Sequence, residues 1–359
     1  MGLETVLPAG SGEASVEMMR QAGIRDVTAP GGVATLYVQE GLDTAVRCSK
    51  RGASRISPWT AFIQPILGNT RLKIRDRCAV RRLVIEQGRV TGIEVRIGGD
   101  KRTRVVQLGP KAEVILCAGA LISPKILLLS GIGPEAHLAS LAIPVQANNP
   151  GVGTGLQDHL LLVTANLCRK KLDASDTNGL GFHGFAHVEG RRLRGVQLLI
   201  KDTWDVPDMA PEVLTAPLSG GWIGRNILRP VLKTVIKGVM FLPPVKNLVR
   251  QSVGIGLALT DPYSRGTIRL ASTDPDDAPL IDPGYLSDER DLQVLEEHFD
   301  VLHTVRETKK AQEWVGMELQ PGPIYRFART GAALRAWARA CGMPYFHAAG
   351  SCRMPLRGA

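Results

Sequence analysis

One histidine near the end of the chain has neighbours suited to a small-molecule site. His347 follows the aromatic pair Tyr345-Phe346 and precedes four small residues, 348–351. Aromatic neighbours favour burial of the imidazole, and small residues let a ligand approach the backbone closely. A histidine whose pKa lies near the working pH is the usual general base of an enzyme. Taken alone, the pattern favours a buried structural histidine over a catalytic base.

Other groups of reactive residues are less specific. The sequence contains no G-x-S-x-G, which argues against a serine hydrolase, and no H-E-x-x-H. His183 and His187 are four residues apart, but glycines nearby weaken a helix there and no third ligand is evident. We therefore expect no metal site. The acids Asp274, Asp276 and Asp277 lie among prolines, which predicts a solvated turn.

The elements that must position His347 follow from the pattern of apolar residues. Alternation over residues 80–86, 90–97 and 103–108 predicts an antiparallel meander. The apolar run 113–117, followed by small residues, predicts a buried strand. A helix should then begin at Ser123 as N-cap, with Pro124 at its first position. Further strands are expected at 33–38, 71–75, 160–166, 185–200, 253–260 and 266–270, and helices at 13–24, 287–312 and 331–341.

Length and composition indicate a two-domain globular protein. The chain has 359 residues, 44% of them hydrophobic and 22% charged. No apolar run is long enough to span a membrane. The start lacks the features of a signal peptide, and the six cysteines form no C-x-x-C pair, so we expect a cytoplasmic protein with reduced thiols.

Basic residues are concentrated in one segment. The net charge is +10, and residues 47–111 alone hold sixteen Lys or Arg against four acids. No nucleic-acid-binding motif accompanies them, so we interpret them as solvated strand faces and expect no nucleic-acid partner. Residues 224–250 are apolar and basic, as in a helix that lies on a membrane. Prolines interrupt this stretch, which favours a helix packed on its own domain and no membrane contact.

Four sequence motifs occur in a fixed order along the chain. They are residues 117–134 (CAGALISPKILLLSGIGP), 149–159 (NPGVGTGLQDH), 263–286 (YSRG, then DP, then IDPGYL) and 347–354 (HAAGSCRM). Together they resemble the glucose–methanol–choline (GMC) oxidoreductase family, whose last motif reads H-x-x-G-T-C-x-M, with Ser351 here in place of Thr. The resemblance extends over roughly residues 20–354.

The resemblance implies a flavoprotein that binds FAD and oxidises the CH–OH group of a small-molecule alcohol. His347 matches the family's catalytic histidine, which accepts the hydroxyl proton while a hydride passes to the flavin. Val80 matches the valine whose backbone contacts the adenine side of FAD. Ala118 and Gly119 match the end of the strand that passes close to the cofactor, where a larger side chain would collide with it.

The resemblance also implies a fold class and domain boundaries. We expect a mixed α/β (α+β) protein with an incomplete Rossmann-like FAD domain and a second domain built on an antiparallel sheet. Residues 1–160 are assigned to the remaining FAD domain, 161–345 to the substrate domain and 346–359 to the start of the C-terminal catalytic segment.

Two features of the family pattern are missing from the sequence. The family's first element, a strand followed by G-x-G-x-x-G and a helix that holds the FAD pyrophosphate, is not found, and the chain ends at Ala359, before the family's second His or Asn. We therefore expect a member with both ends removed and little or no activity of its own. Two alternatives stay open. One is an inactive family fragment that binds no flavin, and the other is a flavin-containing hydroxynitrile lyase.

Overall fold

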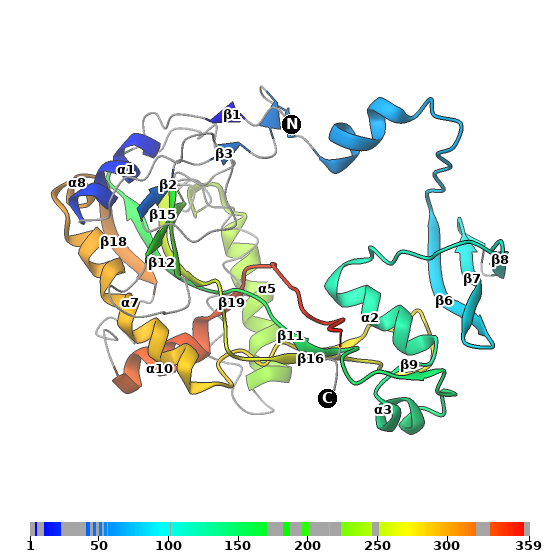
Figure 1. Cartoon of the computed structure of the whole chain (residues 1–359). Coiled ribbons are helices and arrows are strands. Elements are labelled where there is room, and N and C mark those ends of the chain that lie inside the picture. The colour runs from blue at the N-terminus through cyan, green and yellow to red at the C-terminus, as the bar shows by residue number, and fades with distance from the viewer. Residues whose placement is uncertain are drawn as a thin grey trace. The chain divides into compact units, whose positions relative to one another are not determined.

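The chain divides into two compact units, each assembled from separate stretches of sequence (Figure 1). The first unit comprises Met1–Leu67, His159–Asp261 and Glu289–Tyr345, and the second Gly68–Asp158, Pro262–Asp288 and Phe346–Ala359. The computed structural model describes residues 4–5, 11–22, 41–43, 46–47, 50–51, 54–55, 57–100, 102–170, 182–186, 196–201, 215, 224–245, 251–320 and 331–354. The predicted strand at 33–38 lies outside the described residues.

The first unit is built on an antiparallel sheet of seven strands. Its order is β18 (Val315–Gln320), β12 (Leu160–Cys168), β15 (Ser252–Leu259), β14 (Val196–Lys201), β13 (Phe182–Ala186) and β2 (Gly41–Asp43), with β19 (Met343–Pro344) also paired to β12. Short two-stranded pairs accompany it: β1 (Glu4–Thr5) with β3 (Val46–Arg47), and β4 (Lys50–Arg51) with β5 (Ser54–Arg55). A π-helical turn, η1 (Trp59–Ile63), and a 3-10 turn, η2 (Gln64–Ile66), follow.

The centre of this sheet is buried on both faces. Leu162 of β12 is paired with Leu257 of β15, and both are fully buried. The opposite face of the sheet carries a cluster of buried apolar side chains that includes Leu161, Val163 and Leu199. A continuous apolar run is therefore expected in these strands, because neither face meets water. The predictions of strands at 160–166 and 253–260 are confirmed.

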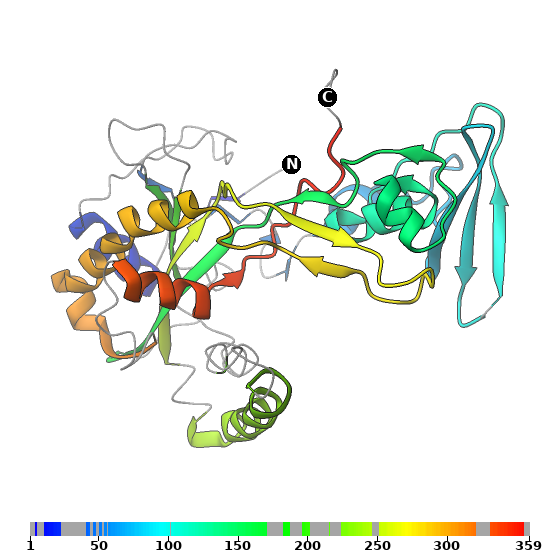
Figure 2. The same ribbon diagram turned by 90° about the horizontal axis from the view of Figure 1, so that it is seen from below.

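Helices α1, α7, α8 and α10 cover one side of the first unit's sheet (Figures 1 and 2). Their bounds are α1 (Ser11–Gln21), α7 (Glu289–Glu307), α8 (Lys309–Trp314) and α10 (Gly331–Cys341). The rings of Phe299 in α7 and Trp337 in α10 meet edge to face, 5.1 Å apart. The predicted helix at 287–312 is interrupted at Thr308, whose hydroxyl accepts a hydrogen bond from Ala311 N and caps α8.

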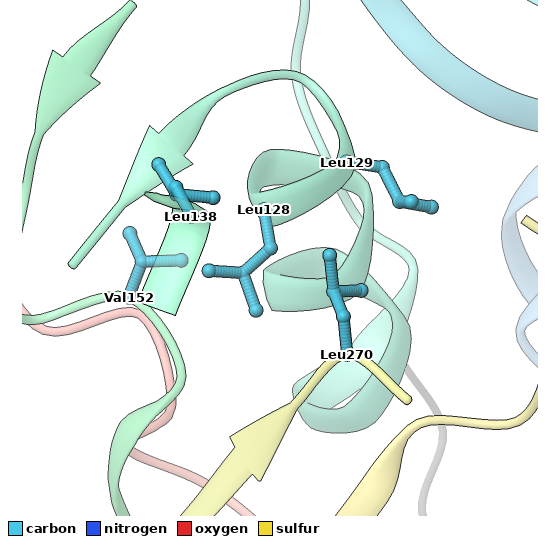
Figure 3. Close-up of a cluster of buried hydrophobic side chains, with 5 residues drawn as sticks. All are labelled: Leu128, Leu129, Leu138, Val152 and Leu270. Atoms are coloured by element: carbon cyan, nitrogen blue, oxygen red, sulfur yellow. The ribbon is translucent and has the colours of Figure 1, made fainter. Parts of the chain in front are cut away.

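The second unit combines two three-stranded sheets and one two-stranded pair with two helices. The predicted meander is confirmed as β6 (Cys78–Glu86), β7 (Arg89–Ile97) and β8 (Thr103–Gln107). The other elements are α2 (Gly119–Leu129), β9 (Ile132–Gly133), α3 (Glu135–Ser140), β10 (Ala147–Asn148), β11 (Thr154–Leu156), β16 (Gly266–Arg269) and β17 (Leu280–Asp282). Figure 3 shows the core of this unit, in which Leu128 and Leu138 are fully buried beside Leu129, Val152 and Leu270. This core joins α2 and α3 to the chain segments that carry the second and third motifs.

Two predicted strands are wrong. Residues 113–117 and 71–75 form no strand, and the side chain of Ile115 is 80% exposed. A strand needs a neighbour for its backbone N–H and C=O groups, and no described segment pairs with either stretch. An apolar run therefore identified a segment able to enter a sheet, without showing that a partner strand lies beside it.

The helix predicted within residues 224–250 is present, and its packing on its own domain stays a prediction. The turn η4 (Gly224–Leu228) leads into α5 (Arg229–Met240), and no residue of α5 is buried. Val231, Val235 and Val239, spaced by four residues along one side of the helix, are all exposed. Pro230 lies in the first turn of α5, where a proline is tolerated, so it begins the helix instead of breaking it. No helix in the described ranges is long and apolar enough to cross a membrane.

These burial differences predict a large loss of stability for one substitution in the first unit and a small change for another. Leu162→Ala removes a fully buried side chain and should lower the free energy of unfolding by about 2–5 kcal/mol. Val235→Lys, at a side chain that is 55% exposed, should change it by less than about 0.5 kcal/mol. Urea unfolding followed by circular dichroism measures both. A large loss in Val235→Lys would show that α5 packs against the protein.

An ion-pair network joins the meander of the second unit to the turn at 274–277. Arg81 of β6 pairs with both carboxylate oxygens of Asp276, and Arg96 of β7 does the same at 2.7 and 3.0 Å. The hydrogen bonds from Arg81 and then from Arg96 hold the pKa of Asp276 well below its usual range. The predicted turn is confirmed, with Asp276 paired to two arginines instead of only solvated.

Asp276→Asn should lower the melting temperature at neutral pH, because an amide cannot balance two guanidinium charges. The pKa of Asp276 is lower in the folded than in the unfolded chain. The ionised carboxylate therefore stabilises the fold above the unfolded pKa of about 3.9, and this stabilisation is lost as the pH falls through the folded pKa. Thermal unfolding of both proteins from neutral to strongly acidic pH should show the difference shrinking in acid. If the difference in melting temperature stayed constant with pH, the ionised Asp276 carboxylate would not be the source of the stabilisation.

Candidate functional site

The segment after His347 is held by backbone hydrogen bonds to the glycine-rich loop of the second motif. Ala349 and Gln157 exchange two bonds of 2.8 and 2.9 Å, as in an antiparallel sheet. Further along, Gly153 N donates to Ser351 O at 2.8 Å, and Arg353 N donates to Gly151 O at 3.2 Å. Two motifs far apart in the sequence thus form one backbone ladder within the second unit.

The surroundings of His347 differ from the sequence prediction. His347 is exposed, and the side chain of Phe346 is 81% exposed, so this aromatic neighbour does not bury the imidazole. Phe346 has φ +62, a left-handed conformation that is rare for a bulky residue. The His347 backbone is nevertheless fixed, because its N–H donates to Asp158 Oδ1 at 2.7 Å. An exposed imidazole on an anchored backbone is accessible to a small molecule.

Helix α2 begins at Gly119, five residues before Pro124, the predicted first helical position. Ala118 is its N-cap, and Ala118 N donates to Ser123 Oγ at 3.1 Å. Pro124 therefore lies inside the helix, where it has no N–H to donate to the carbonyl of Ala120. The Ser351 hydroxyl, which is buried, donates to that Ala120 carbonyl instead. A residue of the fourth motif thus satisfies the carbonyl that Pro124 leaves free, which ties the His347 segment to the Ala118–Gly119 turn.

Val80 lies on β6, the edge strand of the meander. Its side chain is 40% exposed, and the register with β7 shifts immediately after it, between Val80 and Arg82. Ser130, at the end of α2, fixes this strand against the helix by accepting a hydrogen bond from Leu83 N at 2.8 Å. Val80 is thereby held on the same unit as the turn at the start of α2.

All four predicted site residues thus belong to the second unit, and all four are exposed: His347, Val80, Ala118 and Gly119. A cavity of about 490 Å³ in the same unit, lined by β6 and the end of α2, contains none of them. Sequence reasoning gave no role to Asp158, Tyr285 or Ser351, although all three lie within the quoted motifs. Their signal is a polar side chain that is buried (Asp158 and Ser351) or half-buried (Tyr285), which only the fold reveals.

The paired histidines do not form the helix face that a metal site would need. His183 lies in β13, where residues four apart do not share a helical turn, and His187 is outside the described residues. Within the described part of the chain, no group of three or more His, Cys, Asp or Glu side chains could hold a metal ion.

The chain matches two models of a single protein family. The N-terminal model of GMC oxidoreductase matches residues 21–161, and the C-terminal model matches residues 262–358. Together the matches cover more than half of the chain, which therefore belongs to the GMC oxidoreductase family. This confirms the family, and with it FAD as the family's cofactor.

Relatives of known name are similar over most of this chain. An oxygen-dependent choline dehydrogenase from Sinorhizobium medicae (strain WSM419) is 29% identical over 316 residues, which is 88% of this chain and 54% of that protein. Choline oxidase from Arthrobacter globiformis is 30% identical over 304 residues, which is 84% of this chain and 49% of that protein. The chain thus spans about half the length of these relatives.

Solved structures share the fold. Pyridoxine 4-oxidase from Mesorbium loti matches with a TM-score of 0.72 at 22% identity, covering 96% of this chain and 59% of that one. An FAD-dependent oxidoreductase from Chaetomium thermophilum matches with a TM-score of 0.67 at 19% identity, covering 95% and 62%. The expected mixed α/β fold with antiparallel sheets is confirmed. The division into a FAD domain and a substrate domain stays a prediction.

The bond between Ser351 and Ala120 can be tested by removing the hydroxyl. Ser351→Ala leaves the Ala120 carbonyl without its side-chain donor and should lower the free energy of unfolding by about 1–3 kcal/mol. Ser351→Thr, the family's usual residue, keeps the hydroxyl and serves as the control that should lose much less. Urea unfolding compares the three proteins. Equal stability of wild type and Ser351→Ala would contradict this account of how α2 tolerates Pro124.

Proposed function

We propose that this protein is an FAD-dependent oxidoreductase that oxidises the CH–OH group of a small alcohol, with His347 as general base. The observation that carries the proposal is the exposed imidazole of His347 on a backbone anchored to the second motif, in the unit that also holds Val80, Ala118 and Gly119. Choline, named in the two relatives above, indicates the size of substrate to test first.

The residues assigned to FAD are suited to contact with a large planar cofactor. Gly119 has φ +79, and no atom lies within 4 Å of the position where its Cβ would stand, so the backbone there is open to a ligand. Ala118 is small and exposed, and Val80 lies on β6, an edge strand that pairs with β7 alone among the described residues. These residues would hold the cofactor through backbone contacts and close approach, whereas the G-x-G-x-x-G string at residues 179–184 runs into strand β13 and opens no helix that could cradle a pyrophosphate.

The chemistry divides between the protein and the cofactor. Bound FAD supplies a two-electron acceptor for the hydride that leaves the alcohol carbon. His347 accepts the hydroxyl proton at an imidazole nitrogen, so that the C–O single bond becomes a carbonyl as the C–H bond breaks. The alcohol loses two electrons and two hydrogens, one as a proton held by His347 and one as hydride. The anchored backbone fixes where the imidazole can reach the substrate.

A visible absorption spectrum tests the cofactor assignment. We expect the full chain, refolded with FAD and desalted, to retain flavin absorption bands. Gly119→Val and Ala118→Val should reduce the retained flavin, because their side chains would occupy the space assigned to the cofactor. A colourless wild-type protein would contradict FAD binding by these residues and favour the inactive-fragment alternative.

Anaerobic addition of an alcohol tests the reaction. Choline or another small primary alcohol should bleach the flavin bands of the loaded protein slowly, in keeping with the low activity expected from the sequence. His347→Gln should retain flavin while the bleaching rate falls by about 10²–10⁴-fold, the usual loss for a general base. Retained flavin that no alcohol bleaches in the wild type would favour the hydroxynitrile lyase alternative, in which the flavin is not reduced.

A further inference from the structure

A buried carboxylate completes the backbone ladder at the position of His347. The ladder between the second and fourth motifs ends with the pair Gln157 and Ala349. At the next position a side chain replaces the backbone as acceptor: Asp158 Oδ1 receives the His347 N–H at 2.7 Å. Asp158 is only 8% exposed. A carboxylate removed from water is costly unless its oxygens accept hydrogen bonds, so this contact stabilises both partners.

Tyr285 supplies the second donor to this carboxylate. Its hydroxyl donates to Asp158 Oδ2 at 2.5 Å. Burial, and then the hydrogen bond to Asp158, raise the pKa of Tyr285 well above its usual range, so the phenol keeps its proton and remains a donor. The two Asp158 oxygens are therefore each engaged by a different segment of the chain, and the carboxylate cannot rotate without losing one bond.

The contact holds a strained backbone. Phe346, immediately before His347, has φ +62. A bulky residue keeps a left-handed conformation only where its surroundings impose it, and such residues cluster at functional sites. The His347 N–H belongs to the peptide unit that links these two residues, so the Asp158 bond fixes the peptide immediately after the strained residue.

We propose that Asp158 and Tyr285 are positioning residues for His347. The Asp158 carboxylate sets the orientation of the Phe346–His347 peptide, and the Tyr285 hydroxyl sets the orientation of the carboxylate. Neither residue needs to touch the substrate. The proposal rests on the proposed function of His347 as a base, since a base displaced by about 1 Å can lose about 10²-fold in rate.

The first readout is the exchange of the His347 amide proton in the full chain. Selective ¹⁵N-histidine labelling gives backbone amide signals from only seven histidines. The signal that is missing from His347→Gln is assigned to His347. Asp158→Ala should speed this exchange by about tenfold or more, Tyr285→Phe should speed it less, and Asp158→Asn, which keeps an acceptor oxygen, should partly restore protection. Asp100→Ala is the matched control, because Asp100 accepts the Arg102 N–H in a turn of the same unit.

The second readout is the kinetics of the FAD-loaded protein. Asp158→Ala and Tyr285→Phe should lower kcat for alcohol oxidation by about 10- to 100-fold with little change in KM, while Asp100→Ala leaves both unchanged. A purely structural role would lower the amount of folded protein without this separation of kcat from KM. If Asp158→Ala does not fold, Tyr285→Phe, which removes only one hydroxyl, carries the comparison.

The outcomes separate this proposal from the proposed function. Unchanged exchange of the His347 amide in both variants, or unchanged kcat in active protein, would overturn the positioning role. If the wild type binds FAD but oxidises no alcohol, the proposed function fails, and the exchange data alone decide whether Asp158 and Tyr285 anchor His347. Faster exchange together with a lower kcat supports both.

Discussion

The antiparallel pairing of residues 349–353 with 151–157 is the constraint on which the candidate site depends. It brings together two segments that are nearly two hundred residues apart, and it requires their backbones to approach closely. A Cβ at Gly151 would lie 2.2 Å from the Arg353 carbonyl oxygen, and one at Gly350 would lie 2.6 Å from the Gly155 carbonyl oxygen. Gly151 and Gly350 are thus explained by backbone contact between the two motifs before any role in ligand binding is considered.

A second constraint follows from Pro124. A proline inside α2 releases the carbonyl of Ala120, and a released carbonyl at a half-buried position needs another donor. Ser351 provides it from the segment that carries His347. The helix start and the histidine segment therefore stabilise each other: the bond compensates the helix for its missing hydrogen bond and gives the segment a fixed attachment next to Ala118 and Gly119.

The local elements were predictable from the sequence wherever the pattern itself determines burial. Alternating apolar and polar residues predicted the meander, and continuous apolar runs predicted β12 and β15. Burial on one face of a strand produces alternation, and burial on both faces produces a continuous run. The run at 113–117 carries the same signature without a paired neighbour, so the sequence could not decide between strand and coil. The exposed valines of α5 show the same limit, since an amphipathic pattern defines an apolar side and does not define what covers it.

The site depends more on directional contacts than on apolar packing. The first unit buries a continuous apolar sheet, and such packing tolerates small shifts because dispersion and the hydrophobic effect have little directional preference. The segment of His347 is instead held by backbone bonds, a carboxylate and a hydroxyl, each of which weakens steeply when its geometry changes. Contacts that are sensitive to geometry are a poor source of overall stability, but they specify one backbone path for an exposed histidine. The three polar residues that provide this precision were invisible as a group in the sequence, because Asp158, Tyr285 and Ser351 meet their partners only after the two motifs have paired.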